Sequence, residues 1–374
     1  MPDRIKVLFV IPSLACGGAE RVMLLLLRYL NRERYDPVLL TLGEENDFPG
    51  ELAPDVRAVC LRKRSRWDFV QLCRGVVRTL RHERPHLLVS FLTYANWISI
   101  IAAGWSRIGA RVILSERTVL RRNLRVHGYY PLRALLTRWL HPRADGVIAV
   151  SRGVRDELVS HFGVAAGKCF VLPNPVEIER IGTLANEPIE PPLFADDLPV
   201  VVSCGRLVPV KNVPLLLRAI ADIRERRPAH LVILGDGPER HRLEKLAGHL
   251  RVSERVRFLG FQRNPFKYMA ASTVLVLASD CEGFGLVIPE AMACGTPVIA
   301  SDCPFGPSEI LTNGRDGLLF PSGDPQALAE LLVKLLGDAA LRQRLAQAAR
   351  QTVQRYEAKR VVQEYESVFE RVLE

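Results

Sequence analysis

Two glutamates flank a glycine turn in the second half of the chain. Glu282 directly precedes the tripeptide Gly283-Phe284-Gly285, and Glu290 follows it five residues later. A strand is predicted before the turn (273–279) and a helix after it (286–294), so backbone N–H groups and a helix dipole could face a phosphate there. The carboxylates would accept hydrogen bonds from hydroxyls on either side of that phosphate, as in a nucleotide sugar. For this segment alone, a glycine turn without a ligand remains the alternative.

Two basic residues follow another predicted strand, residues 200–204. Arg206 stands just past the end of that strand and Lys211 five residues further on. An arginine can bind a phosphate through two parallel hydrogen bonds, whereas a lysine acts as a point charge. Together they are suited to clamp a diphosphate, although surface salt bridges would explain an isolated pair equally well.

Paired glycines occur near the amino terminus, between a predicted strand (5–11) and a predicted helix (19–30). Gly17 and Gly18 would let backbone and helix dipole approach a phosphate or a sugar closely. The loop lacks the G-x-G-x-x-G spacing of dinucleotide-binding proteins, which argues against a nicotinamide or flavin enzyme. A simple tight turn remains the alternative.

Apolar strands alternate with helices through both halves of the chain, which predicts parallel sheets covered on both faces. We therefore expect an α/β protein with two doubly wound, Rossmann-like domains facing across a cleft. The expected domains cover residues 1–178 and 196–355, and a proline-rich acidic linker spans about 179–195. In such sheets ligands bind at the carboxyl ends of the strands. The helical pattern of residues 356–374 predicts a final helix.

The charge distribution is uneven along the 374 residues. Residues 1–175 carry 27 Lys and Arg against 15 Asp and Glu, a net of +12, and the remainder carries 24 against 26, so the total is +10. A helix predicted between residues 66 and 84 places arginines off an apolar stripe, and a solvated face would explain this helix alone. Because the whole first half is basic, we expect contact with an anionic membrane surface or acceptor. The basic segments lack regularly interleaved aromatics, which argues against nucleic acid.

Composition indicates a globular protein, with 48% hydrophobic and 25% charged residues. The eight cysteines form no C-x-x-C pair, and no apolar signal segment precedes the first strand, so we expect reduced thiols and a cytoplasmic location. The charge-free run of residues 85–106 divides into a strand and a short helix, and we do not expect it to span a bilayer.

Four motifs in order resemble family 4 glycosyltransferases, retaining enzymes with the GT-B fold. The motifs are Gly17-Gly18-Ala19-Glu20, Asn174-Pro175-Val176, Gly205-Arg206-Leu207 with Lys211, and Glu282 with Glu290. The resemblance covers nearly the whole chain, and it implies that the final helix passes back onto the first domain.

The resemblance also implies a role for each motif residue. Arg206 and Lys211 would hold the donor diphosphate and stabilise the leaving nucleoside diphosphate, and Glu290 would bind ribose hydroxyls. Glu282 and the backbone of residues 283–285 (Gly283, Phe284 and Gly285) would bind the transferred sugar and the phosphate. Gly17 and Gly18 would approach the diphosphate from the other domain. The chain has no Asp-x-Asp motif, so we expect no metal and no other cofactor. In such enzymes the departing phosphate helps to deprotonate the acceptor, so no covalent nucleophile is required.

One position departs from the family pattern. Many relatives carry a histidine just past the predicted strand 111–115, whereas this chain has Glu116 and Arg117 there. We expect Glu116, Arg117 and, less directly, His127 to contact the acceptor, with a loop salt bridge of Glu116 as the alternative.

The segment Cys303 to Ile310 resembles members that build bacterial surface polysaccharides and lipid-linked oligosaccharides. The predicted function is therefore retaining transfer of a hexose or N-acetylhexosamine, from a UDP-linked sugar, to a glycan or a polyprenyl-diphosphate-linked acceptor. Such an enzyme would be peripheral on the inner face of the cell membrane. The alternatives are a sugar-nucleotide epimerase or a soluble glucan synthase of the same fold, and a basic nucleic-acid-binding protein.

Overall fold

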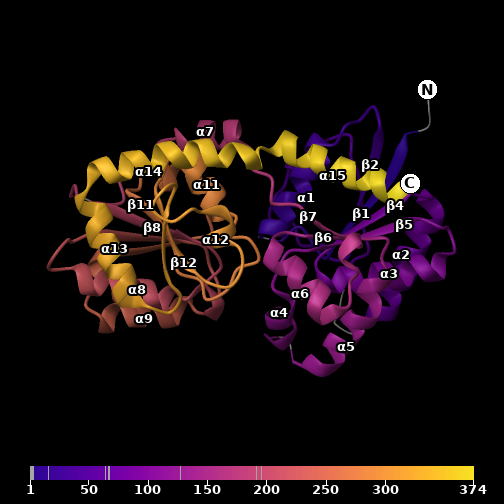
Figure 1. Cartoon of the computed structure of the whole chain (residues 1–374), viewed down its shortest axis with the longest axis horizontal. Coiled ribbons are helices and arrows are strands. Elements are labelled where there is room, and N and C mark those ends of the chain that lie inside the picture. The colour runs from indigo at the N-terminus through magenta and orange to yellow at the C-terminus, as the bar shows by residue number, and fades with distance from the viewer. Residues whose placement is uncertain are drawn as a thin grey trace. The chain divides into compact units, whose positions relative to one another are not determined.

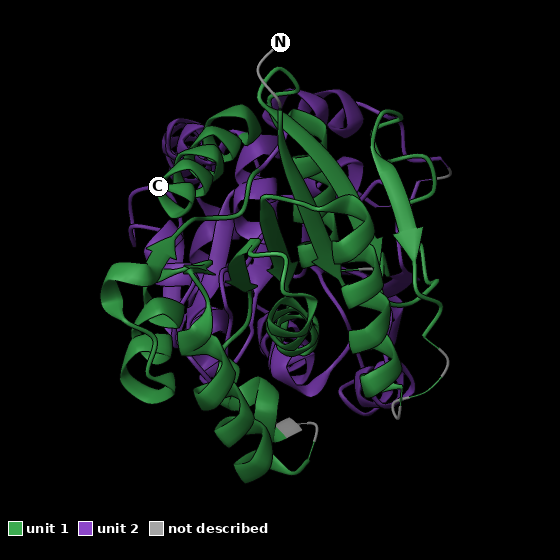
Figure 2. Cartoon of the chain, turned by 90° about the vertical axis from the view of Figure 1, so that its right-hand side faces the viewer, with its two compact units in different colours: residues 1–175, 358–374 green, residues 176–357 purple. Residues whose placement is uncertain are grey.

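The computed structural model describes residues 4–374 except residues 16, 64, 66, 67, 127, 191 and 195. The chain forms two compact units (Figure 2). Unit 1 comprises residues 1–175 together with 358–374, and unit 2 comprises residues 176–357.

Unit 1 is a parallel sheet with helices on both faces (Figure 1). Its strands are β1 (Ile5–Ile11), β2 (Tyr35–Thr41), β3 (Arg57–Cys60), β4 (Leu87–Phe91), β5 (Arg111–Glu116), β6 (Gly146–Ala149) and β7 (Cys169–Val171). Its α-helices are α1 (Gly18–Tyr29), α2 (Phe69–Glu83), α3 (Thr93–Ser106), α4 (Leu120–Val126), α5 (Tyr130–Leu140), α6 (Arg152–Phe162) and α15 (Ala358–Leu373). The strand order is β3-β2-β1-β4-β5-β6-β7, so the order reverses between β1 and β4.

Unit 2 repeats this architecture. Its strands are β8 (Val200–Cys204), β9 (His230–Leu234), β10 (Val256–Gly260), β11 (Val274–Leu277), β12 (Val298–Asp302) and β13 (Leu318–Pro321). Its α-helices are α7 (Ile178–Ala185), α8 (Val213–Ile223), α9 (Arg240–His249), α10 (Phe266–Ala270), α11 (Val287–Cys294), α12 (Pro307–Ile310), α13 (Pro325–Gly337) and α14 (Ala339–Thr352). The order is β10-β9-β8-β11-β12-β13, with parallel pairing between neighbours, and it reverses between β8 and β11.

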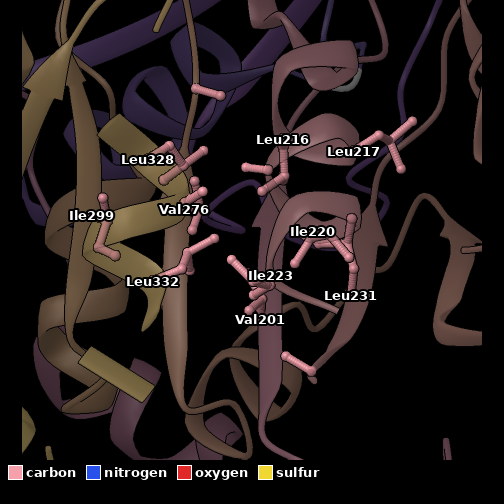
Figure 3. Packing of buried hydrophobic residues seen from close by; sticks show 14 of the residues in the cluster. Val201, Leu216, Leu217, Ile220, Ile223, Leu231, Val276, Ile299, Leu328 and Leu332 are labelled. Atoms are coloured by element: carbon pink, nitrogen blue, oxygen red, sulfur yellow. The ribbon is translucent and has the colours of Figure 1, made fainter. Parts of the chain in front are cut away.

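The cores explain why these segments form strands and helices. The middle of β1 is fully buried, as are all of β4 and β9, because helices cover both faces of each sheet. In unit 2, apolar side chains of α8 and α13 pack onto the strands (Figure 3). Ile223 of α8 and Leu332 of α13 belong to the same buried cluster as Val201 and Val276 of the strands. Two doubly wound sheets confirm the predicted fold class.

The final helix α15 completes the core of unit 1. Its residues Tyr365 and Phe369 are fully buried, and the Phe369 ring meets the rings of Phe9 and Tyr35 edge to face. Arg117, at the end of β5, donates a 2.8 Å hydrogen bond to the Tyr365 hydroxyl. Since edge-to-face aromatic pairs and buried hydrogen bonds both stabilise packing, α15 is an integral part of unit 1.

The structure differs from the sequence-based boundaries in a few places. The short strands β3 and β7 had not been predicted; both are only three or four residues long and offer little periodic signal. The division between units falls after Pro175 rather than at 178, and the first half of the expected linker forms α7 within unit 2. Among the described residues, no helix is both long and apolar enough to cross a bilayer.

Helix α2 uses its apolar stripe for the core of unit 1. Leu72, Cys73, Val76 and Leu80 are buried, whereas Arg74 and its basic neighbours face outward. The amphipathic pattern of this segment is therefore explained, over the described residues of α2, by packing of its apolar stripe in the core, although Val70 remains 49% exposed. Contact of the exposed basic face of α2 with an anionic surface stays a prediction.

Candidate active site

The predicted donor-site residues of unit 2 follow two neighbouring strands at the point where the strand order reverses. The loop after β8 carries Arg206 and Lys211, and the loop after β11 carries Glu282. Because β8 and β11 are parallel and adjacent, both loops leave the same edge of the sheet. Ligands of doubly wound sheets bind at this reversal point.

Lys211 and Glu282 form an ion pair there, with 2.5 Å between Lys211 Nζ and Glu282 Oε1. The Ser279 hydroxyl donates to the same carboxylate oxygen over 2.6 Å. The side chains remain 25% and 11% exposed, respectively, so a ligand can reach the pair. Arg206 is exposed, and in the described part of the chain no hydrogen bond or ion pair of its guanidinium is seen.

Hydrogen bonds between the two loops fix this pair in position. Asn212 adopts a left-handed conformation with φ 45° and donates from Nδ2 to Asp280 Oδ1 over 2.7 Å. The Asp280 N–H in turn donates to the Val210 carbonyl over 2.9 Å. The loops are therefore held together before any ligand binds, which is the condition for preorganised electrostatic binding.

Two glycines let a third loop, after β9, lie directly against the loop after β8. A Cβ atom at position 235 would lie 2.1 Å from the carbonyl oxygen of Gly205, and one at position 237 would lie 2.5 Å from that of Leu207. The Leu207 N–H donates to the Asp236 carbonyl over 2.9 Å. Gly235 and Gly237 are required for this contact, which supports the backbone that carries Arg206.

The glycine turn after Glu282 leads into α11, as predicted. Gly285 has φ 91°, a conformation that side chains rarely adopt. A Cβ at position 306 would lie 2.6 Å from the Phe284 carbonyl oxygen, so the loop after β12 closes over the turn. The Phe284 ring also meets the Tyr356 ring edge to face at 5.5 Å. The turn is therefore a rigid, packed element.

Glu290 lies in the first turn of α11 and is only 5% exposed. Burial, with the nearby Glu290 charge, raises the pKa of the Cys294 thiol to about 12. A carboxylate in the first turn of a helix interacts favourably with the helix dipole. The structure thus places Glu290 beyond the turn and Glu282 before it.

In unit 1, Gly17 is the last residue of the loop between β1 and α1, and Gly18 is the first residue of α1. Gly17 caps the helix in an extended conformation, and a Cβ there would lie 2.2 Å from a carboxylate oxygen of Glu20. The preceding loop is fixed by backbone bonds, among them Leu14 N–H to the Glu45 carbonyl at 2.9 Å. That carboxylate is the mobile end of the Glu20 side chain and Gly17 has an extended backbone, so the structure does not require glycine at 17, and α1 begins at Gly18.

Glu116 is sealed in the interior of unit 1, which argues against the acceptor contact expected from the sequence. It is fully buried, and its Oε1 lies 2.8 Å from both His141 Nε2 and Asn96 Nδ2, while its Oε2 accepts from the Thr93 hydroxyl over 3.0 Å. Buried carboxylates persist in proteins when they are paired and hydrogen-bonded in this way. Glu116 thus ties β5 to α3 and to the segment after α5. The alternative, a solvated loop salt bridge, is not found either, because the partner of Glu116 is the buried His141.

Arg117 is likewise committed to the interior. Its guanidinium donates to Ser115 Oγ over 3.1 Å, to the Tyr365 hydroxyl and to Asn174 Oδ1. The guanidinium carbon also lies 5.0 Å from the centre of the Phe91 ring. Arg117 therefore joins β5 to α15, and the predicted acceptor contact is wrong for this residue. His127, the third candidate, lies outside the described residues.

Several residues of these sites had not been singled out from the sequence. Ser279, Asn212 and Asp280 hold the donor-side loops, and His141 and Tyr365 complete the buried networks of unit 1. The Gly235-Asp236-Gly237 sequence directly after a strand was a signal that could have been found. The other contacts join residues far apart in the chain and leave no local pattern.

The fold and this site define a class of protein. Two doubly wound parallel sheets are the architecture of glycosyltransferases with the GT-B fold, and here a lysine–glutamate pair and a rigid glycine turn lie at the reversal point of the second sheet. The family model described as "Glycosyltransferase Family 4" matches residues 16–180, and the one described as "Glycosyl transferases group 1" matches residues 186–352. The chain belongs to glycosyltransferase family 4.

Relatives of similar length support this assignment. The chain is 30% identical over 339 residues to a Campylobacter jejuni enzyme named N-acetylgalactosamine-N,N'-diacetylbacillosaminyl-diphospho-undecaprenol 4-alpha-N-acetylgalactosaminyltransferase, covering 88% of this chain and 90% of the relative. It is 30% identical over 341 residues to the lipopolysaccharide core biosynthesis glycosyltransferase LpsE of Rhizobium meliloti, covering 90% and 91%. The chain is therefore a glycosyltransferase enzyme.

Solved structures share the fold. HepE of Anabaena in complex with UDP and glucose has a TM-score of 0.82 at 24% identity, covering 98% of this chain and all of that one. A glycosyltransferase from Rickettsia africae has a TM-score of 0.80 at 19% identity, covering 100% and 99%.

Proposed function

We propose that the chain transfers a hexose or an N-acetylhexosamine from a nucleotide sugar to a glycan or lipid-linked acceptor, in the synthesis of a cell-surface polysaccharide. The observation that carries the proposal is the Lys211–Glu282 pair, which lies partly exposed where the strand order of unit 2 reverses. HepE has been solved with UDP, which makes UDP-linked sugars the first donors to test.

Lys211 and Arg206 supply positive charge for the donor diphosphate. In the structure, Glu282 neutralises Lys211 at 2.5 Å, and a bound diphosphate would compete for that ammonium group. Glu282 would then accept hydrogen bonds from sugar hydroxyls. Preorganised charges of this kind stabilise the phosphate oxygen on which negative charge develops as the sugar leaves.

The transfer replaces one C–O bond by another with retention at the anomeric carbon. The bond from that carbon to the phosphate oxygen breaks, and a bond to the acceptor oxygen forms on the same face of the sugar. The departing phosphate takes the acceptor proton, so no covalent nucleophile is needed. The two cations replace a metal in this scheme, and we expect a chelator to leave turnover unchanged.

The proposed class of acceptor is inferred from the names of two relatives. The Campylobacter enzyme is named for an undecaprenol diphosphate glycan and LpsE for lipopolysaccharide core synthesis. A glycan on a polyprenyl diphosphate is therefore the acceptor class that we propose, with the enzyme acting at the inner face of the cell membrane.

The test is a thermal-shift panel of the purified protein with UDP, GDP, ADP and their sugars. A ligand at a hundred times its Kd stabilises the folded state by roughly 2.7 kcal/mol, enough to raise Tm by a few degrees. We expect one nucleotide family to produce the shift, Lys211→Ala to abolish it, and Lys334→Ala, at an exposed lysine of α13, to retain it.

Transfer assays then separate the reaction classes. Donor consumption that requires a lipid-linked glycan supports the proposal. Consumption without any acceptor would indicate an epimerase, and extension of a soluble glucan would indicate a glucan synthase. Absence of a shift with every nucleotide would overturn the assignment of the donor site.

A further inference from the structure

Exposed apolar side chains gather on α5 of unit 1 and on the residue before it. Tyr129 is 86% exposed, Leu132 66%, Leu135 65% and Trp139 56%. Leu132, Leu135 and Trp139 are spaced by three and four residues, so they share one face of the helix. In Figure 1, α4 and α5 lie at the lower edge of unit 1. Contiguous exposed apolar side chains of this size mark an interaction surface.

The opposite face of α5 fixes the orientation of this surface. Thr137 is fully buried, and its hydroxyl accepts a 3.1 Å hydrogen bond from Trp97 Nε1 of α3. The Arg133 guanidinium lies 5.4 Å from the centre of the Trp97 ring, and Leu140 is buried. Because polar and apolar contacts both hold this side against the unit, the apolar stripe cannot turn inward.

Arginines border the exposed stripe and no acidic residue interrupts them. Between residues 118 and 143 the sequence contains no Asp or Glu and six arginines, of which Arg133 packs against Trp97 on the opposite side of α5 and does not border the stripe. Arg138 is exposed, and Arg143 lies over the Trp139 ring at 3.9 Å from its centre. Arg125 similarly lies 5.1 Å from the centre of the Tyr130 ring.

We propose that this surface, Tyr129 with the Leu132–Leu135–Trp139 face of α5, docks onto an anionic lipid bilayer. Tryptophan, tyrosine and leucine bury their apolar parts at the level of the lipid headgroups, and flanking arginines attract anionic headgroup phosphates. The charge complementarity favours a lipid surface over a protein with an uncharged groove. Docking would retain the enzyme where a lipid-carried acceptor resides, and in this respect the inference rests on the proposed function.

The test is co-sedimentation of the purified full chain with vesicles. One set contains phosphatidylglycerol and phosphatidylcholine, and the other contains phosphatidylcholine alone. We expect binding to the anionic set at low salt and weaker binding at high salt, because screening shortens the range of the arginine charges. The variant Leu132→Ser, Leu135→Ser, Trp139→Ser should reduce partitioning at least about tenfold, given the apolar area withdrawn from the bilayer.

A matched control carries Val70→Ser and Trp105→Ser, two exposed apolar residues of unit 1 outside α5, and should bind within about twofold of the wild type. If the triple variant has a lowered Tm, Leu135→Ser alone replaces it as the test variant.

The proposal is overturned if the wild type does not bind anionic vesicles or if the triple variant binds them as well as the control does. A concentration-dependent dimer that the triple variant abolishes would instead make α5 an interface between copies of the chain. Vesicle binding needs neither donor nor acceptor, and the nucleotide thermal shift needs no vesicles, so the failure of one proposal is distinguishable from the failure of the other.

Discussion

Units 1 and 2 each place a glutamate with a nitrogen partner and a hydroxyl at the carboxyl end of their sheets. In unit 1, Glu116 lies 2.8 Å from His141 Nε2 and accepts from the Thr93 hydroxyl. In unit 2, Glu282 lies 2.5 Å from Lys211 Nζ and accepts from the Ser279 hydroxyl. The first pair is fully buried, whereas the second is partly exposed.

The difference lies in what surrounds each carboxylate. Asn96 also donates to Glu116, and helix α3 and the segment after α5 close over the group. The Glu282 pair sits between two loops at the reversal point of the sheet, where the fold leaves it uncovered. The same chemical grouping is thus a structural tie where it is sealed, and it can meet a ligand only where it is partly exposed.

The largest effect is expected from Glu116→Ala. The substitution leaves the buried His141 Nε2 without its partner and takes one of two acceptors from the Asn96 amide, which keeps the Ser115 carbonyl; we expect a cost of about 3–5 kcal/mol of folding free energy. Chemical denaturation should show this loss, and any protein that remains folded should bind the nucleotide as the wild type does. A variant of unchanged stability would contradict the sealed network.

Lys211→Ala should act on turnover instead. Removal of one preorganised charge costs about 10²–10³ in kcat, and the pair is partly exposed, so the folded state should be retained. Initial-rate assays with the true donor measure the effect, with Lys334→Ala as the control. Turnover near that of the wild type would mean that the open pair is not the diphosphate site.

Glu290→Ala is expected to lower turnover by about 10²-fold, because ribose hydroxyls lose their acceptor and the donor is held less well in position. Circular dichroism should show a retained fold. A matched change is Glu309→Ala in α12, a partly exposed glutamate in the first turn of another helix of unit 2. If the two variants keep equal activity, ribose binding must be assigned elsewhere.

The smallest effect is expected from Tyr365→Phe. It removes the hydroxyl that accepts from Arg117 at 2.8 Å and leaves the ring in place. Loss of such a buried bond to a charged group costs about 1.5–3 kcal/mol, and Ser115 and Asn174 remain as partners of the guanidinium, so we expect the lower end. The denaturation midpoint should fall with no change in donor binding.

Local pattern predicted much of the donor side of the molecule. The strand before Glu282, the glycine turn and the start of α11 near residue 287 all follow from periodicity and glycine placement. The strands β8 and β9 were predicted at their observed bounds for the same reason. Short edge strands such as β7 were missed because three residues carry too little periodicity.

The two basic helices of unit 1 show where local pattern fails. Helices α2 and α5 both combine arginines with apolar residues, yet α2 buries Leu72 and Val76 in the core while α5 exposes Leu132 and Leu135. Amphipathic spacing indicates that one face of a helix is apolar, but it does not indicate what covers that face. Only packing decides whether the partner is the sheet or an external surface.

The sequence by itself determined two parallel sheets, the glycine turns and which charges could bind a diphosphate, because each depends on residues close together in the chain. Tertiary structure alone decided that Glu116 and Arg117 are interior residues, since their partners His141 and Tyr365 stand 25 and 248 residues away. It also decided that Lys211 meets Glu282, 71 residues apart, because β8 and β11 become neighbours only when the sheet forms. Burial and long-range contact are properties of the folded chain, and they separate a sealed carboxylate such as Glu116 from an accessible one such as Glu282.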